Sequence, residues 1–434
     1  MIGFISQVSK YIIVLLMAIY TFQCFYVFRH ASEEKRKGTY ILQNIFMFLL
    51  LFLAFAVICV HTQEREILIF FGAQQIILLA ILVLYRIIYP LANRLIVNNM
   101  CMLLSISFIM LTRLSFERSV KQFKIVILSV MLTIFIPFFI SRWKWFKKLT
   151  WVYGGLGIAA LGVVMFLGSI TNGSKLSYTI AGYTFQPSEF VKIIFVFFVA
   201  GMLSKSTELL QVLLVSIVAS IHIIILVLSK DLGSALIFSV TYIMMLYVAS
   251  RNFFYLLGGL AAGVGASVLG YSLFAHVRTR IIAWKDPFSV IENQGYQITQ
   301  SLFAIGTGGW FGMGLYEGAP NKIPVVEADF IFSAISEELG CFFSLCLILI
   351  CISCFVMFMN IAMQIRNRFY QLVALGLGIV YGFQVFLTIG GVIKFIPLTG
   401  VTLPLVSYGG TSVLTTFIMF AIIQGLYIMR KNEG

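Results

Sequence analysis

Acidic side chains gather in one stretch of an otherwise apolar sequence. "PVVEADFIFSAISEELG" (324–340) carries Glu327, Asp329, Glu337 and Glu338 at the approach to, and in the first turns of, an expected membrane helix. Charge at membrane depth is costly and usually marks a site or a pathway. Asp329, one of three aspartates in the chain, is the one of these four that we expect to belong to such a site. For Glu337 and Glu338 we prefer a simpler interpretation, that they pair with loop lysines and hold a helix end. On a helix, only Asp329 and Glu337 would share a face.

Two further stretches place charge at the ends of apolar runs. "QPSEFVK" (186–192) sets Glu189 and Lys192 one helical turn apart, with Ser188 as the expected N-cap after Pro187. Taken alone, it predicts a capped helix with an internal ion pair. "SKDLGSAL" (229–236) sets Lys230 and Asp231 at the mouth of another span.

Cations follow in "HVRTRIIAWKDPF" (276–288), where Arg278 and Arg280 face the same side if the chain is extended. Such a pair suits a phosphate group, although an interfacial anchor beside Trp284 explains it equally well. Together these groups could activate a hydroxyl with a carboxylate and neutralise a leaving pyrophosphate with Lys and Arg. The chain has no P-loop, Rossmann glycine motif, HExxH or GxSxG sequence. A transporter with buried carboxylates remains an alternative.

The elements that position these residues are membrane helices. The 434-residue chain is 61% hydrophobic and 11% charged, and apolar runs long enough to cross a bilayer recur throughout it. We expect an all-α polytopic membrane protein. The net charge of +14 lies in short connections rather than in a basic domain, which argues against nucleic acid and for contact with membrane lipids. The thirteen expected spans are 8–28, 40–61, 67–89, 95–112, 123–140, 149–168, 189–203, 209–229, 234–250, 253–275, 331–359, 371–392 and 412–430.

The basic loops predict the orientation. Loops near 29–37, 142–148 and 366–368, and the tail at 430–431, lie on one side if thirteen spans are right, and this side should be cytoplasmic. The N-terminus and a long connection, 276–330, are then external. Two other external segments, 171–189 and 394–412, hold Pro and Gly at membrane depth, where irregular backbone must be buried or line a cavity. The seven cysteines lie in apolar runs without metal-site spacing.

Five motifs in order resemble one family. They are "FQPSEFVK" (185–192), "KDLGSAL" (230–236), "GYQITQSLFAIGTGGWFGMGL" (295–315), "ADFIFSAISEELG" (328–340) and "PLTGVTLPLVSYGGTSVL" (397–414). Their order resembles the SEDS proteins (shape, elongation, division and sporulation), the RodA/FtsW/SpoVE group. The resemblance implies a ten-helix catalytic core at 95–434, with the large loop 276–330. Residues 1–94 would form an extra N-terminal module of about three transmembrane helices.

The resemblance implies a peptidoglycan glycosyltransferase of the bacterial cytoplasmic membrane, with its active site facing outside. Such enzymes polymerise lipid II, a disaccharide-pentapeptide on undecaprenyl pyrophosphate, and work with a class B penicillin-binding protein. By this resemblance Asp329 is the base, with inversion at the donor's anomeric carbon. The expected substrate-binding residues are Glu189, Lys192, Asp231, Arg278, Arg280, Gln297 and Lys121. The expected supporting residues are Glu327, Gln186, Ser188, Gln300 and Ser407.

The sequence departs from the family pattern in two places. "PVVEADF" lacks the histidine and threonine that often precede the aspartate, and Ser229-Lys230-Asp231 replaces Gln-Pro-Asp. Asp329, Glu189, Lys192 and Asp231 are all kept. A divalent cation, Mg²⁺ or Mn²⁺, would suit a pyrophosphate, although no ligand cluster identifies its site, and no organic cofactor is expected. A flippase for a lipid-linked precursor and a non-catalytic scaffold are the alternatives.

Overall fold

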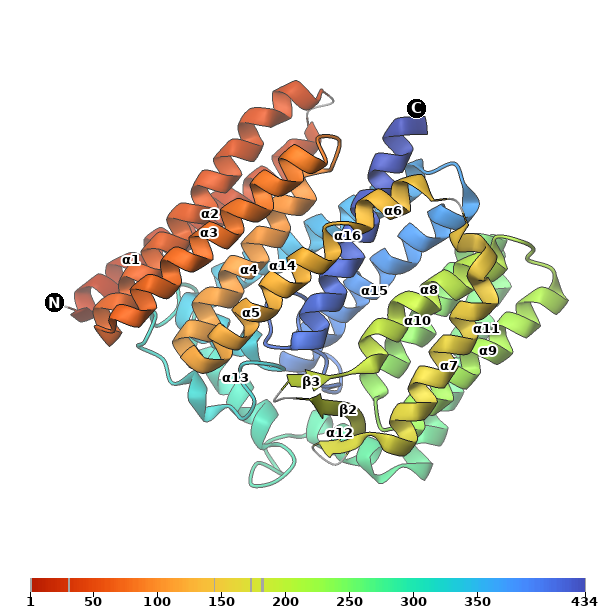
Figure 1. Cartoon of the computed structure of the whole chain (residues 1–434). Coiled ribbons are helices and arrows are strands. Elements are labelled where there is room, and N and C mark those ends of the chain that lie inside the picture. The colour runs from red at the N-terminus through yellow and green to blue at the C-terminus, as the bar shows by residue number, and fades with distance from the viewer. Residues whose placement is uncertain (1, 30–31, 144, 172–173, 181–182, 434) are drawn as a thin grey trace.

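The chain forms a bundle of long helices (Figure 1). This computed structural model describes residues 2–29, 32–143, 145–171, 174–180 and 183–433. Each of the thirteen expected spans coincides with a helix or, for 123–140, with two successive helices. Twelve helical segments of the described chain are long and apolar enough to cross a membrane. The remaining one, α8 (Pro187–Leu203), has 17 residues and is almost entirely buried.

Three helices precede a central one. They are α1 (Ile2–Tyr26), α2 (Glu33–Thr62) and α3 (Arg65–Ile88), with the short 3₁₀ helix η1 (Val27–Arg29) after α1. The fourth helix, α4 (Arg94–Leu114), is buried along nearly its whole length because α2, α3, α5 (Phe116–Thr133) and α14 (Ile331–Gln364) surround it. Its Asn99 accepts a hydrogen bond from Tyr20 of α1 and donates one to Ser353, which joins the first helices to the rest of the bundle.

The remaining helices complete the bundle. They are α5 (Phe116–Thr133), α6 (Ile136–Arg142), η2 (Phe146–Leu149), α7 (Thr150–Leu167), α9 (Leu209–Leu228), α10 (Leu232–Ser250), α11 (Phe253–Leu273), α12 (Ala275–Lys285), α13 (Tyr296–Gly308), η3 (Pro320–Lys322), α14 (Ile331–Gln364), α15 (Arg368–Val392) and α16 (Gly410–Glu433). The last helix, α16, packs against α5, α6 and α8. By contrast, α11 lies at the edge and buries none of its residues.

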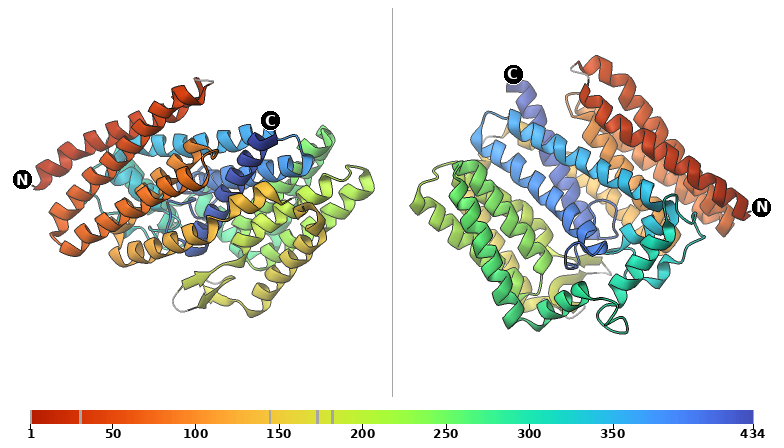
Figure 2. Two further views of the ribbon diagram at one scale, coloured as in Figure 1. Left: turned by 45° about the horizontal axis from the view of Figure 1, so that its top comes forward. Right: turned by 180° about the vertical axis from the view of Figure 1, so that it is seen from behind.

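The two ends of the bundle differ. The C-terminus lies at one end, and the N-terminus lies at the other, with α12 and α13 (Figure 1; Figure 2, right). At the second end the segment 169–185 forms an antiparallel sheet of β1 (Ser169–Thr171), β2 (Ser174–Ile180) and β3 (Tyr183–Phe185). In its register Tyr178 faces Phe185 across the strands. We did not predict this sheet, and residues 172–173 and 181–182 of the segment lie outside the described residues.

The helix α14 is broken at Gly340. This glycine has φ 89° and ψ 172°, a conformation that an L-residue with a side chain rarely adopts. The segment after α13 inserts at the break, where Met313 and Gly314 donate backbone hydrogen bonds to the carbonyls of Glu337 and Glu338. The helix begins only at Ile331. The prediction that Asp329 shares a helical face with Glu337 is therefore wrong, because Asp329 lies in the turn before the helix.

Candidate active site

A cavity of about 680 Å³ opens at the end of the bundle that carries α12 and α13. Segments that are far apart in the sequence meet around it: the approach to α8, the start of α10, the helices α12 and α13, the turn before α14, and the segment 398–412. Of the site residues that we expected from the sequence, Gln186, Asp231, Arg280, Gln297 and Asp329 line it. The expectation that irregular segments at this depth line a cavity is confirmed for 398–412.

Asp329 and Arg280 are the charged centre of this cavity. Arg280 donates a hydrogen bond to the carbonyl oxygen of Thr399, 3.1 Å away, which holds the guanidinium over the cavity. Burial raises the pKa of Asp329 to about 6, and the positive charge of Arg280 opposes this rise. Gly400 lies beside this carboxylate, since an added Cβ atom would be in ordinary van der Waals contact with it at 3.6 Å. Its φ of +74° is what favours glycine there.

Asp231 caps the helix α10. One carboxylate oxygen accepts a hydrogen bond from the Ser234 amide at 3.0 Å, as an N-cap does. The other accepts hydrogen bonds from the side chains of Ser188 at 3.0 Å and Gln186 at 3.3 Å. Ser188 was expected to cap α8, and this is wrong: Gln186 holds the N-cap position and makes no capping bond with its side chain. Ser188 instead joins the start of α8 to Asp231.

The turn before Asp329 is fixed by three contacts. Ser407 donates its hydroxyl hydrogen to the Ala328 carbonyl and accepts a hydrogen bond from the Leu403 amide. Glu327 forms an ion pair with Arg118 at 2.8 Å, and its carbonyl accepts a hydrogen bond from the Tyr408 amide. Through these contacts Ser407 and Glu327, two of the expected supporting residues, hold the turn that carries Asp329.

Glu189 and Lys192 form a buried ion pair of 2.9 Å beside the cavity. Neither of them lines it. Lys192 also donates a hydrogen bond to Gln384 at 2.8 Å, and Gln384 donates one to the Thr402 carbonyl at 3.0 Å. Because Thr402 does line the cavity, the pair can act on the site through the segment 398–412. Their expected role as direct substrate contacts has no geometric support here.

Three more expected residues also lie away from the cavity lining. Arg278 is exposed, because α12 is a helix and residues two apart point in different directions. The expectation of an extended pair of arginines is therefore wrong, and only Arg280 reaches the cavity. Lys121 pairs with Glu117 at 2.7 Å, on the exposed side of α5. Gln300, one turn beyond Gln297 on α13, does not line the cavity.

Glu337 and Glu338 have structural partners, although the partners are not lysines. The buried Glu338 pairs with Arg113 of α4 at 2.8 Å, and Arg113 stacks on the Tyr316 ring at 4.2 Å. Glu337 accepts a hydrogen bond from the Ala319 amide at 2.9 Å. Both carboxylates therefore hold the loop 312–319 against the first half of α14.

Several cavity residues were not among those we selected from the sequence. Polar ones are Ser177, Thr184, Lys230, Thr279, Gln294, Thr399, Thr402, Tyr408, Thr411 and Ser412. Half of them fall in 398–412, so the Thr, Ser and Gly content of this motif was a usable signal. Among the described residues, no three His, Cys, Asp or Glu side chains come together in a way that could hold a metal ion. The described residues therefore hold no ligand cluster for the expected divalent cation.

The sequence of the chain matches known proteins. Residues 85–432 match the family model for FtsW, RodA and SpoVE, described as cell cycle proteins. A protein of Mycobacterium tuberculosis named peptidoglycan glycosyltransferase RodA is 33% identical over 306 residues, which are 66% of this chain and 65% of that protein. The chain thus spans somewhat less than two thirds of the length of this relative. A protein of Tolumonas auensis named probable peptidoglycan glycosyltransferase FtsW is 29% identical over 69% of this chain and 80% of its own length.

Solved structures share the fold. One, reported as a peptidoglycan synthase complex that coordinates polymerization and crosslinking, aligns with a TM-score of 0.66 at 21% identity, over 78% of this chain and 98% of the other. The rod shape determining protein RodA of Thermus thermophilus aligns with a TM-score of 0.57 at 21% identity, over 77% of this chain and 96% of the other. The helices, the cavity and the family match lead to one conclusion: this multi-pass membrane protein belongs to the FtsW/RodA/SpoVE family.

Proposed function

We propose that the chain is a peptidoglycan glycosyltransferase that polymerises lipid II into glycan strands, with Asp329 as the general base. The observation that carries the proposal is the meeting of Asp329 and Arg280 in one cavity of about 680 Å³. A carboxylate beside a cation is what transfer of a sugar from a pyrophosphate to a hydroxyl requires. The names of the relatives from Mycobacterium tuberculosis and Tolumonas auensis support the same reaction.

The reaction assigns a role to each charged group. The Asp329 carboxylate takes the proton from the acceptor hydroxyl while that oxygen forms a bond to the anomeric carbon of the donor. The bond from this carbon to the pyrophosphate oxygen breaks on the opposite face, so that the configuration inverts. Arg280 and Lys230, which line the same cavity, neutralise the charge that develops on the leaving pyrophosphate.

Burial of Asp329 serves this role. A carboxyl with a pKa of about 6 is mostly ionised at neutral pH and is a stronger base than an exposed aspartate. Asp231 supports the site by fixing the start of α10, and Glu189 with Lys192 supports it through Gln384 and Thr402. A divalent cation at the pyrophosphate stays a proposal that a metal titration must test.

The charge distribution supports an orientation in the bacterial cytoplasmic membrane with the cavity outside. In the short connections between helices and in the C-terminal tail, Lys and Arg are more frequent at the end of the bundle opposite to the cavity, at residues 29, 35–37, 86, 94, 142, 147–148, 251, 366, 368 and 430–431. Such an excess marks the cytoplasmic side. Lipid II would then reach the cavity from the outer leaflet.

We also propose a class B penicillin-binding protein as the partner, which would crosslink the strands. The support is the fold shared with a complex reported to coordinate polymerization and crosslinking. The extra module at 1–94 is a further proposal. It is supported by the family match, which starts at residue 85, and by the 98% coverage of that complex's chain against 78% of this one.

The test is polymerisation of lipid II by the purified chain. Asp329→Asn keeps the shape of the side chain but removes the base, so that glycan formation should fall by about a thousandfold or more. Asp286→Asn is the matched control, because Asp286 is exposed and does not line the cavity. Normal polymer formation by Asp329→Asn, with the control also active, would refute the role of Asp329.

The same preparation distinguishes the enzyme from a flippase. A flippase would move lipid II across a liposome bilayer without producing glycan. The cavity lining comes from segments at one end of the bundle, and this favours chemistry at one membrane face over a path through the protein.

A further inference from the structure

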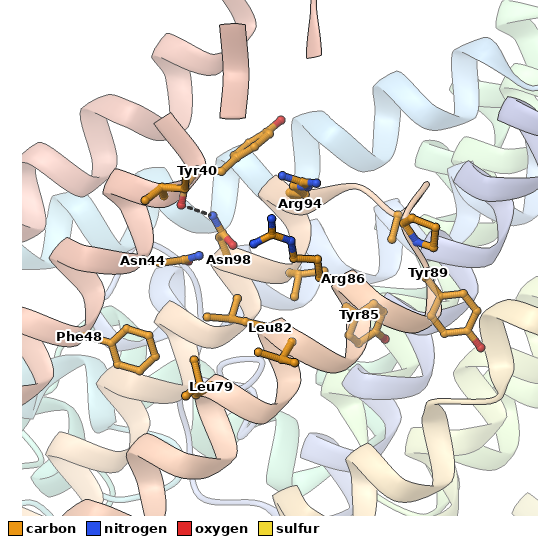
Figure 3. Close-up of a pocket in the computed structure, with 15 residues that line it drawn as sticks. Tyr40, Asn44, Phe48, Leu79, Leu82, Tyr85, Arg86, Tyr89, Arg94 and Asn98 are labelled. Carbon is orange, nitrogen blue, oxygen red and sulfur yellow. Dashed lines mark hydrogen bonds between the residues drawn. The ribbon is translucent and has the colours of Figure 1, made fainter. Parts of the chain in front are cut away.

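A second cavity, of about 200 Å³, lies at the end of the bundle opposite to Asp329 (Figure 3). It is enclosed by α2, α3, the connection after α3 and the start of α4, and it shares no residue with the candidate active site. Most of this lining precedes residue 95, in the part of the chain to which the proposed reaction gives no role.

One end of this cavity is apolar and open. Phe48, Leu79 and Leu82 line it, and Figure 3 shows Phe48 and Leu79 at the side away from Arg86 and Arg94. At its mouth Ile41 is 56% exposed and Leu79 is 54% exposed. These side chains lie on apolar membrane-spanning helices, so the cavity opens toward lipid. An acyl chain would fit such a lining without the loss of any hydrogen bond.

The other end is cationic. Arg86 and Arg94 both line the cavity, and Figure 3 shows their guanidinium groups near Asn98. Neither arginine forms an ion pair with a carboxylate among the described residues. Lys37 joins Arg94 in a small adjacent pocket. Two guanidinium groups at the edge of an apolar cavity favour a phosphate.

Asn44, which also lines the cavity, carries a hydrogen-bond acceptor without a donor in the described part of the chain. Its side-chain oxygen is buried and has no hydrogen-bond partner among the described residues. The neighbouring Asn98 is satisfied, since it donates to the Tyr40 carbonyl and to the Gln43 side chain. A buried acceptor without a partner is costly, and a ligand with a hydroxyl group near its phosphate would supply the donor.

We propose that this cavity binds one anionic phospholipid whose headgroup carries a hydroxyl, with its phosphate on Arg86 and Arg94 and an acyl chain along Phe48, Leu79 and Leu82. The lipid would join the first three helices to α4. The assignment of this lipid to the cytoplasmic leaflet is the one part of the proposal that rests on the proposed orientation. The site itself does not depend on glycosyl transfer. Basic pockets between membrane helices on the cytoplasmic side are known to hold such headgroups.

The experiment is native mass spectrometry of the full chain, delipidated in detergent and titrated with phosphatidylglycerol or phosphatidylcholine of the same acyl chains. We expect one phosphatidylglycerol to bind in preference to phosphatidylcholine. The double variant Arg86→Gln/Arg94→Gln should weaken this binding on the order of tenfold or more. The control Lys205→Gln/Arg366→Gln removes the same charge from exposed positions at the same end and should leave binding unchanged.

Three results would overturn the proposal: equal binding of both lipids, an equal loss in the control, or binding of glycerol phosphate as tight as that of the lipid. Folding of each variant is checked by its elution profile and thermal unfolding. Should the double variant fail to fold, Arg86→Gln alone changes an exposed residue and gives the same comparison. Loss of polymerisation without loss of lipid binding would affect the proposed reaction and leave this site intact.

Discussion

At the scale of single residues, the charge state of Asp329 sets the pH dependence of the proposed reaction. Burial raises its pKa from 3.8 to about 6 against the opposing effect of Arg280. A general base acts only when ionised, so the rate should be nearly constant above pH 7 and fall about tenfold for each pH unit well below 6. Polymerisation rates measured from pH 4.5 to 8 check this expectation.

Arg280 provides a second test of the same carboxyl. Its positive charge lowers the pKa of Asp329, so Arg280→Gln should raise that pKa and move the fall in rate to higher pH. The variant will also be slower overall, because the leaving pyrophosphate loses a cation. The quantity to compare is therefore the pH at which the rate falls. If this pH is the same in the variant and the parent chain, Arg280 does not act on Asp329.

Asp231 combines two roles that substitution can separate. Its carboxylate caps α10 and accepts bonds from Ser188 and Gln186. Asp231→Ala should destabilise the fold by about 1–2 kcal/mol, because the cap is lost and Ser188 loses its partner. Asp231→Asn keeps a capping oxygen and should lower the thermal midpoint less. If both variants unfold at the same temperature as the parent chain, the capping role is wrong.

At the scale of elements, the long helices could be predicted because each needs only an apolar run of sufficient length. Three local features could not be predicted in the same way. The sheet at 169–185 depends on pairing between short strands. The position of Arg280 depends on the chain being helical at α12. The break in α14 depends on a segment that inserts there from elsewhere in the sequence. The site was predicted in part. Spacing identified the Glu189–Lys192 ion pair, but spacing alone could not show that the pair lies outside the cavity lining.

The break in α14 gives an element-scale prediction. At Gly340 an added Cβ atom would lie 2.3 Å from the Gly312 nitrogen, in a backbone conformation that disfavours side chains. Gly340→Ala should cost about 3 kcal/mol or more, or prevent folding. Gly258→Ala in α11 is the control, because nothing lies within 4 Å of its added Cβ. Alanine should stabilise that helix slightly. Thermal unfolding of both variants measures the contrast, and equal midpoints would contradict it.

At the scale of the whole molecule, the first helix, which precedes the family match, is tied to the interior of the bundle and to its cavity end. Asn99 links α1 and α4 to α14 in the interior. At the cavity end, Ser6, Gln7 and Lys10 of α1 donate hydrogen bonds to the carbonyls of Leu315, Met313 and Gly312. That segment in turn packs on Glu337 and Glu338. The first helix therefore reaches the helix that follows Asp329 in two ways, by packing on it directly and through this segment.

This connection predicts that α1 restrains the segment 309–316. In the triple variant Ser6→Ala/Gln7→Ala/Lys10→Ala three hydrogen bonds are lost, each contributing about 1 kcal/mol. Amide hydrogen exchange at Met313 and Gly314 should then accelerate by an order of magnitude or more, because local opening becomes easier. Ser267→Ala is the control, since the hydroxyl of this exposed residue bonds within α11, to the Gly263 carbonyl, far from the segment. Unchanged exchange in the triple variant would mean that broken helix α14 alone holds the segment, and that α1 serves the bundle interior rather than the cavity end.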